Sequence, residues 1–357
     1  MIRIAQVGVG VRGKQWARVI REEPNAAVVA YVDLRFPALK QEMAEFGEAV
    51  PCFNDLAQAL DETKPDAVLL ATPPEGHREQ AMMAFERGMH ALVEKPLTED
   101  LAEAIHLVRE AERRNLQLMV GMNFRYLPTH QAIRRTISGG QLGQPSFAQF
   151  SYLRHRDGRR ADLNKYCLTQ KQPMLMEQSI HHLDLMRYCY GREVEWVQAD
   201  TWNPPWSTYQ DDSNVSVLLC FEGGLRVNYL GTWTAAWNKF DFRWRTDCSG
   251  GVLIQKAQFD DLYMARFSPE LALSGGRFKA EAEPLEPVRL KPAEYFIDDT
   301  RGLLAEFVEA LGASKPVETS GEDHLKTLAL ILACIESGKT GQRVQMSEFY
   351  RKHDVPH

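Results

Sequence analysis

Short apolar runs alternate with longer amphipathic stretches over the first 122 residues of the chain. A continuous apolar run is typical of a strand in a parallel sheet that carries helices on both faces. The predicted buried strands are 3–7, 27–32, 67–71, 90–93 and 116–120. Between the last two strands, the stretch 99–114 is a predicted helix with Thr98 as its N-cap. This part of the chain is therefore predicted to be an α/β domain.

After Pro145 the pattern changes to longer strands in which apolar and polar residues alternate. Such alternation indicates an open, mostly antiparallel sheet with one buried face, and Gly223 and Gly224 mark a turn between two of its strands. The predicted strands are 146–154, 194–202, 214–221, 225–233 and 252–258. Terminal helices near 300–311 and 323–337 are predicted to cover the sheet or the domain junction.

Length and composition fit a globular protein of two domains. The chain has 357 residues, which is more than one ordinary hydrophobic core accommodates. Of these residues 44% are hydrophobic and 25% are charged, as in globular proteins. The predicted fold class is α/β. Residues 1–122 form a domain with a parallel sheet, and residues 123–357 form an α/β domain with a large open, mostly antiparallel sheet.

Charge and hydropathy exclude several classes of partner. The net charge is −6, and no run of Lys and Arg is interleaved with aromatic residues, so we expect no nucleic-acid partner. No apolar run approaches the ~20 residues that span a bilayer, and the N-terminus has no signal-peptide pattern. We therefore expect a cytoplasmic protein without a membrane partner. The six cysteines stand singly, without the spacing of a zinc site, which favours buried free thiols.

The first predicted strand runs directly into a glycine-rich turn that opens a helix. In Gly8-Val9-Gly10-Val11-Arg12-Gly13, Gly8 permits the tight turn, Gly10 lets the backbone approach a pyrophosphate, and Gly13 allows close packing of helix and strand. The helix N-terminus attracts the phosphates. A G-x-G-x-x-G turn in this context predicts a Rossmann domain that binds a dinucleotide, with Val11 and Arg12 in the turn beside it.

Asp33 ends the second strand, 20 residues after Gly13, where a carboxylate accepts hydrogen bonds from the ribose hydroxyls of NAD. A 2′-phosphate is repelled there, so NAD is predicted over NADP. Arg35 partly offsets this repulsion, which leaves NADP open. The strand 67–71 is followed by candidate cofactor contacts at the same sheet edge, namely Thr72, Pro73 and His77.

Glu94-Lys95-Pro96 places two opposite charges at the carboxyl end of an apolar strand. An ammonium group there can hold a substrate hydroxyl or relay its proton, because the pKa of lysine falls readily on partial burial. A solvated turn is the alternative interpretation. We predict that Glu94 and Lys95 lie in the cofactor crevice.

Glu177, His181 and Asp184 have the spacing of one helix face within a largely apolar segment. A carboxylate one turn from an imidazole orients it and tunes its pKa, which favours acid/base chemistry. Metal binding by the same three side chains is the alternative. His182 points elsewhere on the helix and is assigned a structural role.

These motifs, taken in order, resemble the glucose-fructose oxidoreductase/inositol dehydrogenase (Gfo/Idh/MocA) family over essentially the whole chain. The resemblance rests on the glycine turn, Thr72-Pro73-Pro74, Glu94-Lys95-Pro96, Gly121-Met-Asn123-Phe-Arg125-Tyr126 and the helix from Glu177 to Asp184. It implies a Rossmann domain, an α/β domain whose open sheet forms the contact of a homodimer or homotetramer, and oxidation of a secondary alcohol of a sugar or cyclitol or the reverse reduction.

The resemblance also implies roles for single residues. Lys95 matches the catalytic lysine of the family, with a peptide bond to Pro96 that is often cis, and His181 matches the catalytic histidine. Asn123 and Arg125 match positions that line the cofactor and the substrate cleft. Many members have Asp where this chain has Glu177, which extends the carboxylate by one methylene and allows it to hold His181.

Our hypothesis from the sequence is that a sugar or polyol hydroxyl lies between Lys95 and His181, that Asp184 binds a second hydroxyl, and that NAD takes the hydride. Further side chains that could contact a sugar ring or a carboxylate are His155, Arg156, Tyr166, Trp202, Trp206, Trp233, Trp237 and Arg243. Two alternatives remain open at this point: an NAD-recycling enzyme that cleaves glycosides on the same scaffold, and a sugar-sensing regulator without turnover.

Overall fold

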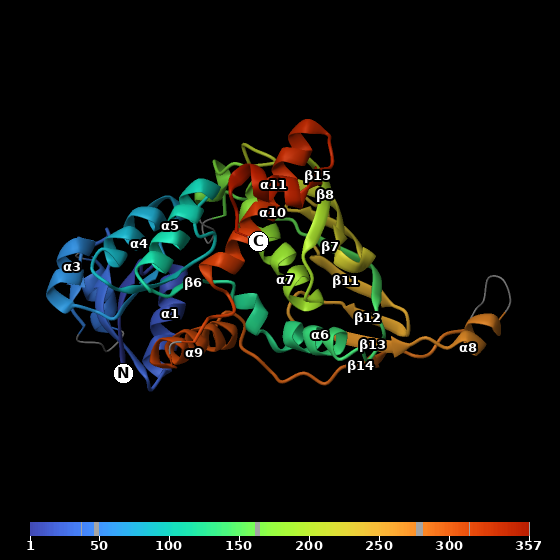
Figure 1. Cartoon of the computed structure of the whole chain (residues 1–357), viewed down its shortest axis with the longest axis horizontal. Coiled ribbons are helices and arrows are strands. Elements are labelled where there is room, and N and C mark those ends of the chain that lie inside the picture. The colour runs from blue at the N-terminus through green and yellow to red at the C-terminus, as the bar shows by residue number, and fades with distance from the viewer. Residues whose placement is uncertain (37, 46–49, 161–164, 276–280, 314, 357) are drawn as a thin grey trace. The chain divides into compact units, whose positions relative to one another are not determined.

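The computed structural model describes residues 1–36, 38–45, 50–160, 165–275, 281–313 and 315–356. The chain divides into two compact units (Figure 1). The first unit comprises Met1–Tyr126, Ala293–Leu328 and Val355–His357, and the second comprises Leu127–Pro292 and Ala329–Asp354. The boundary expected near residue 122 differs mainly in that the segment 293–328 belongs to the first unit.

The first unit contains a six-stranded parallel sheet in the order β3-β2-β1-β4-β5-β6. Its strands are β1 (Ile2–Val7), β2 (Ala26–Val32), β3 (Cys52–Phe53), β4 (Ala67–Leu70), β5 (His90–Val93) and β6 (Leu118–Val120). The order reverses between β1 and β4, and a crevice at the carboxyl ends of such neighbouring strands is where α/β sheets bind ligands. The predicted parallel Rossmann sheet is confirmed.

Helices cover this sheet. They are α1 (Val11–Glu22), α2 (Ala38–Glu45), α3 (Leu56–Thr63), α4 (His77–Phe85), α5 (Leu101–Arg113) and α9 (Asp298–Ala313). The N-cap predicted for α5 was wrong by two residues. The side chain of Asp100 accepts the hydrogen bond from Glu103 N–H at 3.0 Å, whereas the hydroxyl of Thr98 donates to the Asp100 carbonyl.

Helix α9 comes late in the chain but belongs to the core of the first unit. Leu303, Leu304 and Phe307 on α9 are fully buried, and they form one apolar cluster with Ile4 of β1 and Trp16 of α1. Figure 1 shows α9 beside α1. The core of the parallel sheet is thus completed by residues from the C-terminal part of the chain.

The second unit contains a nine-stranded sheet in the order β14-β13-β12-β11-β7-β10-β9-β8-β15. All neighbouring strands are antiparallel except β7 and β10, as the mostly antiparallel sheet predicted from the sequence requires. The strands are β7 (Pro145–Leu153), β8 (Val194–Trp202), β9 (Asn214–Phe221), β10 (Arg226–Thr232), β11 (Asp241–Cys248), β12 (Gly251–Gln255), β13 (Leu262–Arg266), β14 (Glu286–Pro287) and β15 (Val344–Gln345).

Strand β11 was missing from the predicted strands, although its sequence carries the signal. Phe242, Trp244 and Thr246 are buried and alternate with more exposed charged residues, the period-two pattern of a sheet with one open face. The remaining helices are α6 (Pro128–Ser138), α7 (Ile180–Tyr190), α8 (Pro269–Leu273), α10 (Gly321–Thr340) and α11 (Met346–His353).

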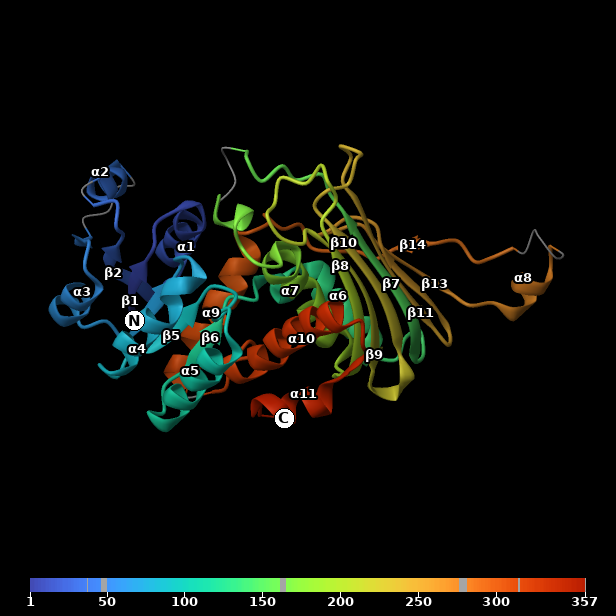
Figure 2. The same ribbon diagram turned by 90° about the horizontal axis from the view of Figure 1, so that it is seen from above.

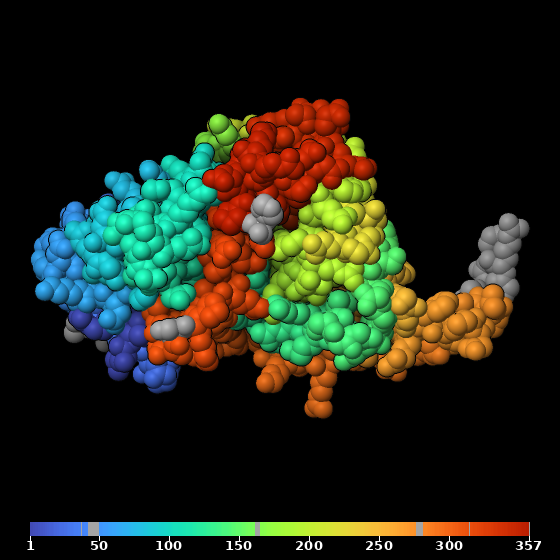
Figure 3. All heavy atoms as spheres, in the orientation of Figure 1, coloured from blue at the N-terminus to red at the C-terminus, as the bar shows by residue number. Residues whose placement is uncertain are grey.

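Helix α7 lies on the buried face of the large sheet, on the same side as α6 (Figure 2). The imidazole of His182 packs between Phe150 and Tyr152 of β7, at ring-centre distances of 4.7 and 4.8 Å. Every residue of α7 is buried, including His181, His182 and Asp184. The segment that carries α8 extends away from the sheet edge (Figure 3).

None of the six cysteines, all of which the structure describes, forms a disulfide; Cys52 and Cys248 are partly buried and the other four are buried. Among the described residues, no helix combines the length and the apolar character that a bilayer crossing requires.

Replacing Phe307 with Ala tests the assignment of α9 to the first core. We expect the free energy of unfolding to fall by about 3–5 kcal/mol, because the change removes a fully buried ring and leaves a cavity. Urea unfolding followed by tryptophan fluorescence measures it. Glu309→Ala on the same helix is the control, since its solvent-exposed pair with Lys315 contributes little to stability. Equal effects of the two substitutions would contradict the assignment.

Candidate functional site

The glycine turn between β1 and α1 has the geometry of an anion-binding site. Gly8 has a positive φ of 88°, and a Cβ there would lie 2.6 Å from the carbonyl oxygen of Ala71. A Cβ on Gly13 would collide with the carbonyl of Gly8, whereas a Cβ on Gly10 would meet nothing within 4 Å. Gly10 is the N-cap of α1 and supplies no side-chain cap, so the N–H groups of the first turn are available to a pyrophosphate. These residues fit a dinucleotide.

Asp33 and Arg35 face each other just after β2. The guanidinium of Arg35 donates to both carboxylate oxygens of Asp33 at 3.0 Å, and Val9 N–H donates to the same carboxylate at 2.9 Å. Burial acts to raise the pKa of Asp33, but the hydrogen bonds from Arg35 and Val9 outweigh it and hold the pKa below its ordinary value. Asp33 is therefore ionised at neutral pH, as an acceptor for ribose hydroxyls must be.

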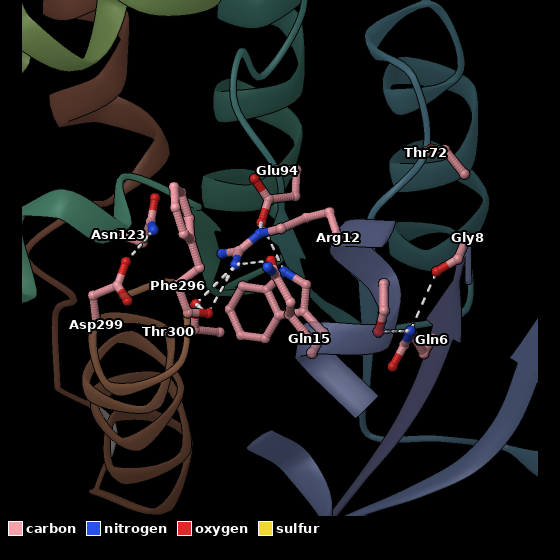
Figure 4. A network of polar contacts seen from close by, with 12 residues as sticks. Gln6, Gly8, Arg12, Gln15, Thr72, Glu94, Asn123, Phe296, Asp299 and Thr300 are labelled. Carbon is pink, nitrogen blue, oxygen red and sulfur yellow. Dashed lines mark hydrogen bonds and ion pairs between the residues drawn. The ribbon is translucent and has the colours of Figure 1, made fainter. Parts of the chain in front are cut away.

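Arg12 lies at the centre of a polar network that joins the glycine turn to the end of β5 (Figure 4). Its Nε donates to Glu94 Oε1 at 2.6 Å, and the indole N–H of Trp16 donates to the same oxygen at 2.7 Å. Its Nη1 donates to Thr300 Oγ1 at 2.8 Å. The two predicted cofactor residues Arg12 and Glu94 thus bind each other, and this pair holds the segment that precedes Lys95.

Asp299 is a member of this region that the sequence did not reveal. It is fully buried on α9, and the side-chain amide of Asn123 donates to its carboxylate. Burial raises the pKa of Asp299 to about 6, against the opposing effects of Arg12 and Asn123. Its sequence signal, an acidic pair at a helix start, is the same as that of an ordinary solvated first turn.

His77 ties two strand ends together. Its ring nitrogens lie 2.9 Å from the carbonyl oxygen of Thr72 and 3.0 Å from that of Pro96. Both nitrogens are therefore occupied by backbone, and burial lowers the pKa of the imidazole. We revise the predicted role of His77 from a cofactor contact to a support of the loop that carries Lys95.

Lys95 follows β5 directly and is half-buried. The Lys95–Pro96 peptide bond is cis, as the family resemblance implied. One residue further on, the N–H of Leu97 donates to His324 Nε2 at 3.3 Å. Backbone contacts to two histidines, His77 and His324, thus flank the loop.

Glu177 lies in a π-helix, Met174–Ser179, that leads into α7. The regular α-helical spacing predicted from Glu177 to His181 was therefore wrong in this turn, which is wider. The hydroxyl of Tyr166, a predicted substrate residue, donates to Glu177 Oε2 at 2.6 Å. Burial and the adjacent carboxylate raise the pKa of Tyr166 well above its ordinary value, so it stays a donor. Single π-turns of this kind are frequent at functional sites.

The histidine pair at the start of α7 divides into two environments. His182 is fully buried, with its ring nitrogens 3.1 Å from Gln178 Nε2 and 2.9 Å from Tyr229 Oη. Burial lowers the pKa of His182 to about 3, so its imidazole is neutral. His181 is also buried, but 7% of its surface stays exposed to solvent. The structural role assigned to His182 agrees with these contacts.

Two further predicted site residues, Asp184 and Arg125, lie near oppositely charged side chains of the protein. Asp184 is buried, and its carboxylate lies 3.9 Å from Arg187 Nη1. Arg125 donates to Asp323 at 2.5 Å, and its side chain is buried.

Among the described residues, no group of three or more His, Cys, Asp or Glu side chains forms a possible metal site. Lys95, Asn123 and Arg125 belong to the first unit, whereas Tyr166, Glu177, His181 and Asp184 belong to the second.

Comparison with known proteins finds a family match in each of the two units. The model of an oxidoreductase family with an NAD-binding Rossmann fold matches residues 2–122, and the Gfo/Idh/MocA C-terminal domain matches residues 130–254. A D-apiose dehydrogenase of Paraburkholderia graminis is 26% identical and covers 96% of this chain and 89% of its own length. An inositol 2-dehydrogenase of Saccharopolyspora erythraea is 33% identical over 56% of each chain.

The fold also matches solved structures. An oxidoreductase from Agrobacterium radiobacter, in complex with NAD+, L-tartaric acid and magnesium, superposes with a TM-score of 0.85 and 20% identity. The match covers 97% of this chain and 99% of the other. It extends the likeness of fold to nearly the whole chain.

Replacing Arg35 with Ala tests how the Asp33 pair selects the dinucleotide. We expect the Kd for NADPH to rise about tenfold, since a lost contact with a phosphate is worth about 1.4 kcal/mol. The Kd for NADH stays equal or falls, because Asp33 is released. Titration of cofactor fluorescence measures both values, with Arg35→Lys as the charge-retaining control. An unchanged ratio of the two Kd values would show that Arg35 does not select.

The pKa of Asp299 predicts a pH dependence of stability. A carboxyl group whose pKa is raised from 3.8 to about 6 on folding binds more protons folded than unfolded at intermediate pH, so stability is lost as pH rises through about 6. Relative to Asp299→Asn, the wild type should lose up to about 3 kcal/mol between pH 4 and pH 7. Urea unfolding of both proteins across this range measures the loss, and parallel pH profiles would refute it.

Proposed function

Because this chain belongs to the Gfo/Idh/MocA family of oxidoreductases, whose N-terminal domain is an NAD-binding Rossmann fold, we propose that it interconverts a secondary alcohol and a ketone on a sugar, cyclitol or related polyol. Relatives over part or most of the chain are named D-apiose dehydrogenase and inositol 2-dehydrogenase, which act on a sugar and a cyclitol by name. We assign the contacts of a homodimer or homotetramer to the second unit, together with the substrate contacts other than those of Lys95 and Arg125, which belong to the first unit.

The position of Lys95 carries the proposal. The glycine turn follows β1, Lys95 follows β5, and only β4 separates these strands in the sheet. The ammonium group therefore belongs to the same carboxyl edge as the dinucleotide site. Glu94 and His77 hold the loop around it through contacts of 2.6 to 3.0 Å.

NAD supplies the acceptor for the hydride that leaves the carbinol carbon. In the proposed reaction His181 accepts the hydroxyl proton, and Lys95 stabilises the negative charge that develops on the oxygen. Glu177, held by the hydroxyl of Tyr166, is assigned to orient His181. Asp184 is assigned to a second hydroxyl of the substrate, and Asn123 to the cofactor. In the reverse direction the same groups return the proton.

Replacing Lys95 with Met and His181 with Ala tests these roles. On a substrate found by an NAD-linked absorbance screen of sugars, polyols and their acids, we expect each variant to lower kcat by about 10² to 10⁴, the usual contribution of a positioned acid or base. The Kd for NADH, measured by fluorescence, should stay within about twofold.

Lys315→Met, which removes an exposed lysine from the first unit, is the matched control for the loss of a positive charge. Near-normal turnover of either variant would remove that residue from the reaction. Bound cofactor that copurifies, together with bond cleavage of a glycoside and no net NADH, would instead identify the glycoside-cleaving alternative.

A further inference from the structure

Two arginines continue the buried side of β7 beyond its end. Tyr152 packs on His182 of α7, and the side chain of Arg154 follows it on the same side, with Nη1 donating to Tyr152 Oη at 3.3 Å. The backbone N–H groups of Arg154 and Arg156 donate to the carbonyls of Thr232 and Trp233 at 3.1 and 2.8 Å. The segment is therefore anchored to the end of β10.

Arg154 lies close to the π-turn that contains Glu177. The phenol of Tyr152, which accepts the hydrogen bond from Arg154, donates in turn to Gln178 Oε1 at 3.2 Å. Two hydrogen bonds therefore connect the Arg154 guanidinium to the residue next to Glu177. The phenyl ring of Phe240 lies 5.9 Å from the same guanidinium.

Arg156 rests on a buried aromatic base. Its guanidinium lies 4.1 Å from the ring centre of Trp233, which is fully buried and packs at 5.2 Å on Tyr209. The hydroxyl of Tyr209 donates to the Arg156 carbonyl at 3.0 Å. A guanidinium stacked by its face keeps its N–H edges for a ligand, and those edges match the two oxygens of a carboxylate or phosphate.

Both guanidinium groups act on the same phenol. Arg154 and Arg156 lie two positions apart in an extended segment, so their side chains leave it on the same side. Both also lower the pKa of Tyr209, against the larger rise that burial causes. The two cations therefore form one positively charged corner on this side of the segment, and Arg154 connects it to the turn of Glu177.

Within the described part of the chain, no ion pair balances the charge of this corner. Among the residues that the structure describes, neither Arg154 nor Arg156 forms an ion pair, although both are half-buried. Arg159, three residues further on, does pair with Asp157 at 2.9 Å. A partly desolvated cation without a counter-ion gains most from an anionic ligand.

We propose that the substrate carries an anionic group, a carboxylate or a phosphate, and that Arg154 and Arg156 bind it. The inference rests on the proposed function, because it takes the π-turn of Glu177 to face the substrate. It narrows the substrate class from polyols in general to sugar acids or sugar phosphates.

Matched substrates test the inference. Galactose, galacturonate and galactose 6-phosphate, the corresponding glucose set, and inositol with inositol phosphate are compared in NAD-linked turnover. We expect the kcat/KM of one anionic member to exceed that of its neutral partner at least a hundredfold, and whether the acid or the phosphate is preferred identifies the group. Equal or better turnover of the neutral members would overturn the inference and leave the proposed function standing.

Variants of the two arginines locate the group. Arg154→Met and Arg156→Met should each raise KM for the anionic substrate at least thirtyfold, with kcat and the KM of the neutral partner changed less than about threefold. Arg159→Met is the matched control, because it removes a paired and exposed arginine from the same loop. Parallel loss on anionic and neutral substrates would contradict an anion site.

A binding measurement separates the two proposals. Calorimetric titration of the NADH-loaded full chain with each member of the sets requires no turnover. Binding of anionic members that both Met variants abolish would support the inference even if no turnover were found, in which case only the proposed reaction fails. Binding that both Met variants retain, or no binding of any anionic member, would overturn the inference.

Discussion

The carboxylate of Glu94 is the contact on which the rest of the first unit depends. A single oxygen of this group accepts hydrogen bonds from Arg12 and from the indole of Trp16, both on α1. The helix that begins at the glycine turn is thereby fixed to the end of β5, one residue before Lys95. Removing one partner of such a pair leaves a partly buried charge uncompensated, so the geometry of the phosphate-binding turn and of the Lys95 loop are coupled.

The second unit repeats this arrangement with different elements. The carboxylate of Glu177 is held by the hydroxyl of Tyr166 within a π-turn, one helical turn before His181. In each unit, a carboxylate that accepts a hydrogen bond from another side chain therefore lies close in the sequence to a residue with a proposed catalytic role: Glu94 to Lys95, and Glu177 to His181. The neutral His182, enclosed by Tyr229 and Gln178, gives this turn a rigid base. In the proposed reaction, each of these carboxylates would hold a reacting side chain in position without contacting the substrate.

Local pattern determined much of this fold. Five of the six strands of the parallel sheet followed from continuous apolar runs, whereas the two-residue strand β3 was not predicted. The glycine turn followed from residues whose Cβ atoms would collide with Ala71 or Gly8. Interactions between segments that are distant in the sequence could not be predicted from local patterns. The contact of Asp299 with Asn123 spans 176 positions, and nothing near Asp299 distinguishes it from a solvated helix start. The π-turn at Glu177 was equally hidden, because a wider turn has no residue pattern of its own.

Because α9 lies late in the sequence, the core of the first unit is completed late in synthesis. Trp16 and Ile4 are covered by Leu303, Leu304 and Phe307, and Arg12 is bonded to Thr300. A nascent chain that has emerged only as far as residue 126 has all six strands of the parallel sheet but not this cover. Its apolar face stays open while residues 127–292, the larger part of the second unit, are synthesised. The cofactor domain, although encoded first, is completed only when nearly the entire protein has left the ribosome.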